Sequence, residues 1–423
     1  MPKAKKNNLI SLDTLPEDQI YWKKVYNVLN DLADAYGFDR LELPVAERED
    51  LFTKKLKEYT NDCNTDICVL QNISGDRISL RPDFVPSISR AYLDNNLAGM
   101  PKPVRLHTTG PIFCGGDKQV ILTQDYQASF EIIGEKDSVI DAQLVQLLFS
   151  LGKELGFKNL ITQINNIGCS RCRPAYRKAL VNFYKDKEKM ICSNCNHHLM
   201  LTPMKLLSCK DEKCAKLISA APQMIDYLCH ECHDHFISML EFLDEVNIPY
   251  ILNPYLFKST NYHTKTIFEV AVDSQGGSVP FAFGHRHDDL IGALGGESTP
   301  AAGVDVRMNS IVDLMKINKI KVNIKQRPLI FLVQLGVLGK KKSLVLFEQL
   351  RRGGLRVASS VSYNTMTSQV EAAKKLGARF VLILGQKEAL DDTIIVRDAY
   401  SGIQEIVPIN KLVKNIKKRL KEK

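Results

Sequence analysis

The chain has 423 residues, of which 44% are hydrophobic and 25% are charged, and its formal net charge is +9. A chain of this length and composition can bury a large core and is expected to form two or three domains. It contains no run of about eighteen apolar residues and no apolar signal segment near its start, which argues against a membrane span and a secretory signal. We therefore expect a cytoplasmic protein with no membrane segment.

The first third of the chain mixes helical and strand patterns. Residues 18–36 have the apolar spacing of a helix, and the runs 41–44 and 78–80 are typical of short strands. Between 104 and 134, two apolar stretches flank a polar, glycine-containing turn at 114–119. This arrangement predicts two strands joined as a hairpin.

A cysteine-rich and mostly helical segment follows at 168–247. Strand patterns return at 266–272 and 279–282, before a glycine-rich turn and a helix over 306–316. A basic linker at 319–326 then marks a change of composition.

From residue 328 onward strands alternate with helices, which predicts a small α/β domain with a largely parallel sheet. No glycine-rich nucleotide motif opens any of its helices, so we expect a binding module. The last thirteen residues carry seven Lys or Arg, and such basic surface favours nucleic acid. The alternative is an amphipathic terminal helix that packs on the body. Its apolar side would consist of Leu412, Val413, Ile416 and Leu420.

Eight cysteines of the segment 168–247 come in four close pairs. The pairs are Cys169 with Cys172, Cys192 with Cys195, Cys209 with Cys214, and Cys229 with Cys232. Four thiolates bind one Zn²⁺ tetrahedrally, so these pairs are enough for two structural zinc sites. Disulfides and unligated core thiols are the alternatives, and the sequence leaves open which cysteines share an ion. Neighbouring imidazoles could also replace a thiolate, namely those of His197, His198, His230, His233 and His235.

The stretch 253–270 reads NPYLFKSTNYHTKTIFEV. It closely resembles the signature of histidyl-tRNA synthetases, an Arg-Gly-Leu-Asp-Tyr-Tyr run before a Thr-(Lys/Arg)-Thr-x-Phe-Glu strand. Further segments resemble that family in the same order. They are LDTLPEDQIYWKKVYNVLNDLADAYGFDRLELPV, LRPDFVPSISRAY, GPIFC, QDYQASFEIIG and HRHDDLIGALGGESTPAAG, followed by the terminal α/β module. The chain thus resembles a histidyl-tRNA synthetase over almost its whole length.

The resemblance implies an α+β class II synthetase core, in which an antiparallel sheet is flanked by helices. The core would comprise 1–167 and 248–320, with a Cys-rich, zinc-binding insertion at 168–247 and an anticodon-binding-like α/β domain with a basic tail at 328–423. Some bacterial members resemble the chain in this insertion as well. The family works as a dimer, and it uses ATP and Mg²⁺ to form histidyl-adenylate before passing histidine to tRNA. These are the cofactors and partners that the resemblance implies.

Several positions match residues that hold substrate in the family. Asp83 stands where the family has a carboxylate for the substrate ammonium group. Gln127 and Glu131 match a substrate-contacting pair, although Glu131 alone could also be a surface carboxylate at a strand edge. The full set of substrate-binding candidates is Asp83, Gln127, Glu131, Tyr262, His263 and Arg286, with His263 at the last tyrosine of the signature.

The catalytic positions differ from the family pattern. Cys114 replaces the arginine that grips the α-phosphate, and Ser310 replaces the arginine of the third class II motif. Lys258 replaces the signature arginine, so the charge is kept but the planar fork that makes bidentate contacts is lost. Arg307 stands where the motif usually has glycine, and it could either take over from the missing motif arginine or simply close the pocket. Lys258 and Arg307 are therefore the candidate catalytic residues.

Residues 283–289, FGHRHDD, replace a Gly-Gly-Gly-Arg-Tyr-Asp-Gly floor beneath the substrate, and Phe or His side chains would obstruct close approach there. Losing one donor to a developing charge costs about 10² to 10³ in rate, and only Lys118 and Lys265 are further nearby cations. We therefore expect weakened or absent aminoacylation. Two hypotheses stay open: an active, divergent histidine-tRNA ligase, and a silent paralogue that binds tRNA, histidine or another protein as a sensor or accessory subunit.

Overall fold

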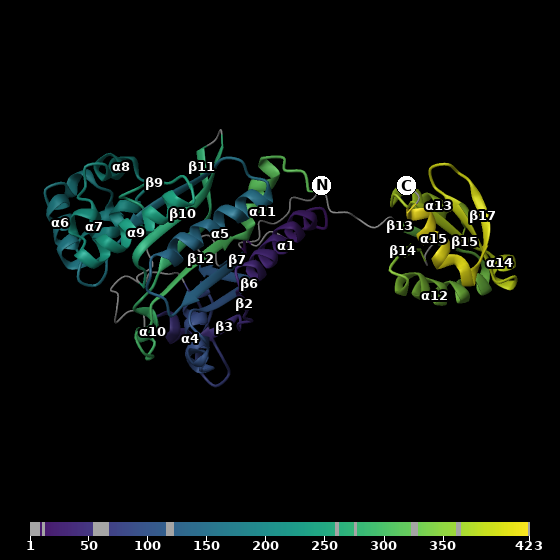
Figure 1. Ribbon diagram of the computed structural model, residues 1–423, viewed down its shortest axis with the longest axis horizontal. Coiled ribbons are helices and arrows are strands. Elements are labelled where there is room, and N and C mark those ends of the chain that lie inside the picture. The colour runs from purple at the N-terminus through teal and green to yellow at the C-terminus, as the bar shows by residue number, and fades with distance from the viewer. Residues whose placement is uncertain are drawn as a thin grey trace. The chain divides into compact units, whose positions relative to one another are not determined.

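The computed structural model describes residues 9–10, 13–53, 67–115, 122–258, 262–274, 277–322, 329–360 and 365–421. They fall into two compact units, Met1–Val322 and Asn323–Lys423 (Figure 1). Most of the turn expected at 114–119, with Lys118, and part of the basic linker lie outside the described residues.

The first unit is organised around a nine-stranded sheet in the order β2-β6-β7-β12-β11-β10-β8-β9, with β1 paired to β7. These strands are β1 (Leu9–Ile10), β2 (Asp39–Arg40), β6 (Val104–Gly115), β7 (Leu122–Ile133), β8 (Leu160–Asn166), β9 (Ile251–Leu252), β10 (Thr264–Ser274), β11 (Gly277–Arg286) and β12 (Ala301–Arg307). All pairings from β6 to β8 along this order are antiparallel. The antiparallel core expected from the sequence is confirmed.

The expected hairpin at 104–134 is confirmed by β6 and β7, which pair from Val104 opposite Ile133 to Gly115 opposite Leu122. The expected strand at 41–44 is wrong, because the ladder with β6 ends where the Leu41 amide bonds the His107 carbonyl. Pro44 has no amide hydrogen to continue it. A separate three-stranded sheet contains β3 (Ala46–Arg48), β4 (Cys68–Gln71) and β5 (Arg77–Leu80).

Four helices cover one face of the large sheet: α1 (Gln19–Ala35), α5 (Val139–Leu155), α9 (His230–Glu245) and α11 (Met308–Ile317) (Figure 1). Buried residues of α1 recur at helical spacing, as Trp22, Val25, Leu29 and Leu32 show. The even-numbered residues of β7 and β12 face the same core, including Phe130 and Val304. Because side chains alternate along a strand, the odd-numbered residues must face the other side.

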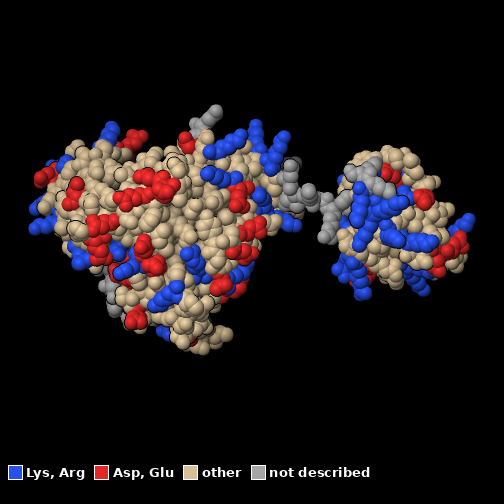
Figure 2. Space-filling view, in the orientation of Figure 1, with Lys and Arg blue, Asp and Glu red and all other residues tan. Residues whose placement is uncertain are grey.

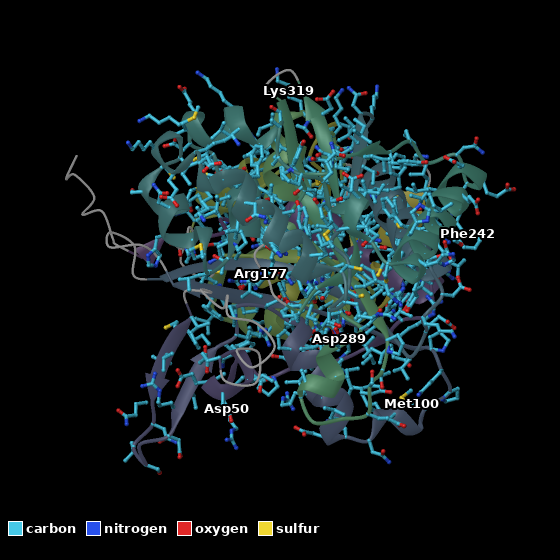
Figure 3. The ribbon with its side chains drawn as sticks, turned by 90° about the vertical axis from the view of Figure 1, so that its left-hand side faces the viewer. Asp50, Met100, Arg177, Phe242, Asp289 and Lys319 are labelled. Carbon is cyan, nitrogen blue, oxygen red and sulfur yellow. The ribbon has the colours of Figure 1, made fainter. Side chains whose placement is uncertain are left out.

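That other side is covered by two groups of elements. The first contains α2 (Glu49–Phe52), α4 (Val85–Asp94), η1 (Leu97–Gly99) and α10 (Leu290–Ala293). The second is the Cys-rich insertion, with α6 (Arg173–Lys185), η2 (Glu188–Met190), α7 (Ser193–Leu199), η3 (Pro203–Ser208), α8 (Glu212–Ile218) and η4 (Met224–Tyr227). Figure 3 views the unit from the insertion side, where Arg177 marks α6 and Asp289 marks the start of α10. The insertion core reaches the sheet at Ile267 and Phe283.

The second unit has a five-stranded sheet in the order β14-β13-β15-β16-β17. Its elements are β13 (Leu329–Gln334), α12 (Gly336–Arg352), β14 (Arg356–Ser359), α13 (Met366–Lys375), β15 (Phe380–Leu384), α14 (Gln386–Leu390), β16 (Thr393–Asp398), β17 (Gln404–Pro408), η5 (Ile409–Lys411) and α15 (Leu412–Lys421). Strands β13, β14 and β15 are parallel, as expected, but β16 pairs antiparallel with β15 and forms an antiparallel hairpin with β17. The expected largely parallel sheet is thus only partly right.

The terminal helix α15 is amphipathic. Leu412 and Ile416 are buried in the core of the second unit, and Val413 and Leu420 pack against it. The lysines of α15 lie on its exposed side, and Lys and Arg side chains gather on the visible face of this unit (Figure 2). Both expectations for the tail, an apolar packing side and a basic surface, therefore hold at once.

Candidate functional site

The candidate site lies on the odd-numbered face of β7, β12 and β11, which we call the pocket face. In the sheet, Glu131 of β7 pairs with Gly303 of β12, and Gly303 pairs with His285 of β11. Two residues further along, on the same face, Ser129 lies opposite Asp305. The strand register alone therefore brings two carboxylates and an imidazole onto one buried surface.

Because Gly303 has no side chain, the side chains of Glu131 and His285 on either side of it can approach each other. A Cβ on Gly303 would lie 2.1 Å from Oε1 of Glu131, so the carboxylate would have to move if this position carried a side chain. Strands are about 4.8 Å apart, so Glu131 and His285 start from positions about 9.6 Å apart and lean towards each other over Gly303. Glycine at this position leaves room for the Glu131 carboxylate in its observed place.

Asp305 is the most heavily hydrogen-bonded member. Its Oδ1 accepts from Nε2 of Gln127 at 2.6 Å and from the Ser129 hydroxyl at 2.8 Å. Its Oδ2 lies 3.3 Å from Nε2 of His285. Burial opposes ionisation of Asp305, but the contact with His285 and the positive charge of Lys258 outweigh it and lower its pKa.

Three imidazoles fill the space beside these carboxylates. The rings of His263 and His285 stack with centroids 4.4 Å apart. Nδ1 of His285 lies 3.3 Å from Nδ1 of His287, and Nε2 of His287 lies 3.3 Å from Oε2 of Glu131. Burial, followed by the proximity of His285, lowers the pKa of both His263 and His287 well below the usual value. Both rings are therefore neutral at pH 7.

Glu131 and Asp83 are two carboxylates that have little contact with solvent. Burial, and then repulsion from Asp305 and Asp83, raises the pKa of Glu131 well above its usual value. Asp83 accepts a hydrogen bond from the Tyr262 hydroxyl, and burial followed by repulsion from Asp305 raises its pKa. The substrate-binding candidates Asp83, Gln127, Glu131, Tyr262 and His263 are thus brought together at one surface.

The two catalytic candidates lie towards the edge of this group. Nζ of Lys258 lies 4.2 Å from the ring centroid of Phe283, and its charge lowers the pKa of Asp305. Arg307 is exposed at the end of β12, opposite Gln127 in the sheet. Both cations oppose the rise in the pKa of Glu269 that burial causes. Cys114 is exposed near the end of β6, so it brings no cation to the site.

Arg286 belongs to the opposite face, which corrects its expected place in the pocket. Even-numbered residues of β11 point towards α5, and Nη1 of Arg286 donates to Oδ2 of Asp141 at 2.5 Å. Its Nε donates to Asp288 at 3.1 Å, and its Nη2 donates to the Glu135 carbonyl at 2.7 Å. A guanidinium that is 0% exposed and held in this way joins the sheet to α5.

The eight cysteines form two groups, and the sulfur atoms of each group lie within 4.8 Å of one another. The first group consists of Cys169, Cys172, Cys229 and Cys232, and the second of Cys192, Cys195, Cys209 and Cys214. Among the described residues, neither group includes a histidine. The pairing that the sequence left open therefore joins residues some sixty positions apart in the first group.

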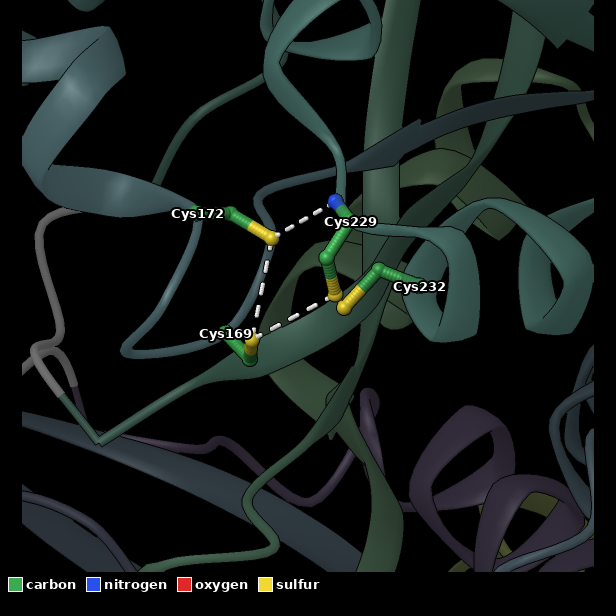
Figure 4. Close-up of side chains that lie close together, drawn as sticks. All are labelled: Cys169, Cys172, Cys229 and Cys232. Carbon is green, nitrogen blue, oxygen red and sulfur yellow. Dashed lines mark hydrogen bonds between the residues drawn. The ribbon is translucent and has the colours of Figure 1, made fainter.

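Sulfur spacing in the first group matches a tetrahedral ion. Sγ of Cys169 lies 3.6 Å from Sγ of Cys172 and 3.9 Å from Sγ of Cys229 (Figure 4). A disulfide bond is about 2.0 Å long, whereas thiolates 2.3 Å from a central Zn²⁺ are about 3.8 Å apart. Burial opposes ionisation of Cys169, but amides of Arg171 and Cys172 hydrogen-bond its sulfur and lower its pKa to about 6.

The second group repeats this geometry around helix starts. Sγ of Cys192 lies 3.8 Å from Sγ of Cys209, and Sγ of Cys214 lies 3.6 Å from Sγ of Cys195. Cys192 precedes the first turn of α7, and its amide donates to Sγ of Cys214 at 3.2 Å. In the first group the amide of Cys229, which precedes α9, donates to Sγ of Cys172 at 3.1 Å. Such amide hydrogen bonds stabilise negative sulfur.

Sequence reasoning missed Asp305 and Ser129, and it treated His285 and His287 only as obstructions. The signal was available as alternation: polar residues recur at every second position in Gln127-x-Ser129-x-Glu131, inside an otherwise apolar strand. In the parts of the chain that the structure describes, no helix is long and apolar enough to cross a bilayer. The expected cytoplasmic location stays a prediction.

Comparisons with known proteins agree with this fold. A family model described as histidyl-tRNA synthetase matches residues 11–311, and an anticodon binding domain model matches residues 337–419. A histidine–tRNA ligase of Dehalococcoides mccartyi is 32% identical over 409 residues, covering 96% of this chain and 98% of its own. One from Thermodesulfovibrio yellowstonii is 30% identical, covering 95% and 96%.

Among solved structures, the apo histidyl-tRNA synthetase of S. aureus superposes with a TM-score of 0.78 at 25% identity, covering 96% of this chain and 97% of its own. The match extends over both units of the structure, and the family models divide the chain in the same order. The chain therefore belongs to the histidyl-tRNA synthetase family.

Proposed function

We propose that this family member binds tRNA and makes histidyl-adenylate only weakly or not at all. The observation that carries this proposal is the occupation of the pocket face by the chain's own side chains. His285 stacks on His263 and contacts Asp305, while His287 contacts Glu131. Groups that would bind histidine therefore bind one another.

The positively charged side chains that would hold the phosphates of ATP are also few. Of the positions where the family has arginine, Cys114 and Ser310 carry no charge, and Lys258 provides a point charge in place of a bidentate fork. Each lost donor to a developing charge costs about 10² to 10³ in rate, so two independent losses cost about 10⁴ to 10⁶. Arg307, exposed at the end of β12, is the remaining candidate for contact with the phosphates of ATP, which the family binds together with Mg²⁺.

The decisive experiment is histidine-dependent exchange of pyrophosphate into ATP with Mg²⁺ present. We expect no signal above the rate measured without histidine. A robust histidine-dependent signal would refute the loss of adenylate formation. Tyr262→Phe is an internal control, because a true histidine pocket would lose exchange when the hydroxyl bound to Asp83 is removed.

Binding of tRNA is supported by the second unit, which matches the anticodon binding domain model. The exposed side of α15 carries Lys414, Lys417, Lys418 and Lys421. Each phosphate contact contributes a slope of about −0.7 to −0.9 in log affinity against log salt. We expect tRNA binding that weakens steeply with salt, and salt-independent or absent binding would contradict the proposal.

A second candidate function is an active, divergent histidine-tRNA ligase. It is favoured by the shared surface of Asp83, Gln127, Glu131 and Tyr262, which retains the substrate-holding groups. On this hypothesis Lys258→Arg would restore the fork and raise exchange about 10²-fold or more. An unchanged absence of exchange in that variant favours the silent paralogue.

We also propose that each cysteine group holds one structural Zn²⁺, because the sulfur spacing of 3.6 to 3.9 Å fits four thiolates around that ion. Metal analysis of protein purified under reducing conditions should find two zinc ions held by thiolates. A homodimer is a further proposal, taken from the family resemblance. Light scattering of the purified chain tests it, and a monomeric mass would reject it.

A further inference from the structure

We propose that the pocket face contains a divalent transition-metal site formed by Glu131, His285 and Asp305. One donor atom of each side chain lies within 4.8 Å of the donors of the other two, and all three residues are buried. The three come from adjacent strands of the sheet, so their backbone positions are fixed. This inference goes beyond the proposed function, since it requires neither tRNA binding nor the loss of adenylate formation.

The donor spacing suits a small ion. Two ligands about 2.1 Å from a tetrahedral ion are separated by about 3.4 Å. Nε2 of His285 and Oδ2 of Asp305 are 3.3 Å apart, so both could coordinate with little movement. A carboxylate oxygen of Glu131 completes the set of three donors. Nε2 of His287 lies 3.3 Å from Oε2 of Glu131 and is a neighbour of this set, not a member of it.

One carboxylate oxygen of Glu131 is buried without a hydrogen bond. Glu131 is 1% exposed, its Oε2 makes no hydrogen bond among the described residues, and the nearest polar atom given for it is Nε2 of His287 at 3.3 Å. A buried polar group without a partner costs free energy, and a buried carboxylate costs more. Asp305 places a second carboxylate oxygen within 4.8 Å of a carboxylate oxygen of Glu131. A divalent cation between these groups would offset their negative charge.

The surrounding side chains fix the orientation of the donors by hydrogen bonds. The Ser129 hydroxyl lies 2.8 Å from Oδ1 of Asp305 and 3.4 Å from Oε1 of Glu131, and Gln127 donates to the same Oδ1 of Asp305. Oδ1 is therefore occupied, which leaves Oδ2 for an ion. Partners of this kind orient metal ligands and tune affinity. Gly303 makes the convergence of Glu131 and His285 sterically feasible.

The donor types select the class of ion. One imidazole with two carboxylates suits zinc, manganese, iron or cobalt and lacks the sulfur that the cysteine groups offer. Three protein ligands would leave a coordination position open for a water molecule or a small ligand. The site is thus chemically distinct from the two thiolate groups, and that difference allows it to be detected separately.

The test uses the full chain, stripped of metal under reducing conditions and titrated with Co²⁺ alone. Cobalt bound to thiolates shows sulfur charge-transfer absorption, whereas cobalt bound by imidazole and carboxylates shows only ligand-field bands. We expect one equivalent of bound Co²⁺ without sulfur absorption. If all bound cobalt carries sulfur absorption, or if the pocket binds free histidine and no cobalt, the proposal is overturned.

Variants locate the bound ion. Loss of a residue that hydrogen-bonds a metal ligand lowers metal affinity about 10-fold to 100-fold, so Ser129→Ala should fall in that range. Removal of a direct ligand in Glu131→Gln or Asp305→Asn should lower the affinity further, by more than about 100-fold. Glu269→Gln is the matched control, because Glu269 is a half-buried carboxylate outside the ligand set. Equal affinity in Glu131→Gln and Glu269→Gln would reject the site, and Trp22 fluorescence verifies that each variant is folded.

Discussion

Replacing Arg286 with methionine tests whether the sheet is joined to α5 by a buried ion pair. The side chains of Arg286 and Asp141 are 0% and 1% exposed, and they meet at 2.5 Å. Breaking one partner of such a pair costs about 3 to 5 kcal/mol, because the other charge stays buried. The carbonyl of Glu135 also loses its donor, which adds about 1 kcal/mol. We therefore expect Arg286→Met to lower the free energy of unfolding by about 4 to 6 kcal/mol.

Fluorescence of Trp22 during urea unfolding is the appropriate assay. Trp22 is the single tryptophan of the chain, lies in α1, and is 8% exposed with its ring 5.3 Å from that of Tyr126. Its signal therefore reports the first unit without a contribution from the second. Arg48→Met is the control, because the ion pair of Arg48 and Asp50 is exposed and is worth at most about 1 kcal/mol.

The pH dependence of the free energy of unfolding gives an independent check on the role of the Arg286–Asp141 ion pair. Burial opposes ionisation of Asp141, but the charge of Arg286 and the contact with His235 outweigh it and lower its pKa. A lowered carboxylate pKa contributes stability above the unfolded pKa near 3.9, and this stability is lost as the pH falls through the folded value. Without Arg286, burial should raise the pKa of Asp141, so the deficit of Arg286→Met should shrink as the pH falls from 7 to 4. The double variant Arg286→Met with Asp141→Leu should recover most of the loss.

A deficit below about 1 kcal/mol at pH 7, equal to that of Arg48→Met, would refute this reasoning. It would mean that the guanidinium is hydrated or that Asp141 has another strong partner. A deficit of the expected size that does not change with pH would instead show that lost packing, and not the uncompensated carboxylate, dominates the cost.

Three further predictions concern other parts of the chain. Cys232→Ser should reduce thiolate-bound zinc from two ions to one, measured by metal analysis, and retention of both ions would contradict the grouping of the cysteines. Gly284→Ala should destabilise the first unit by about 1 to 3 kcal/mol or more in Trp22-monitored unfolding, because its Cβ would lie 2.0 Å from the ring of Phe268. Replacing Lys417 and Lys418 with alanine should reduce the salt slope of tRNA binding by about 2, in a filter-binding assay across salt concentrations.

Much of the fold was predictable because local patterns and tertiary structure agree. The apolar spacing of 18–36 predicted α1, and two apolar runs around a polar turn predicted the β6–β7 hairpin. The strand expected at 41–44 failed because its apolar residues pack in an extended segment that ends at Pro44 without a ladder. Strand β17 follows β16 as a hairpin, and no α/β alternation signals that reversal.

The candidate site was only half predictable. Matching of family positions found Asp83, Gln127 and Glu131, because Gln127 and Glu131 match the family's pair and Asp83 keeps the carboxylate charge in a shorter side chain. It misplaced Arg286. Because side chains alternate along β11, Arg286 faces α5 while its sequence neighbours face the other side of the sheet. The grouping of cysteines required tertiary contacts between segments about sixty residues apart, which residue spacing does not encode.

Alternate residues of β7, β11 and β12 face the apolar core and the pocket face. The fold is therefore more sensitive to a change in the length of these strands than to single substitutions in them. Successive residues lie on opposite faces of the sheet. A one-residue insertion or deletion would therefore exchange Phe130 with Glu131, or Val304 with Asp305, between the apolar core and the charged pocket face. Point substitutions on one face leave the other nearly untouched. We expect natural and laboratory variation here to proceed by replacement, with changes of length confined to the loops between the strands.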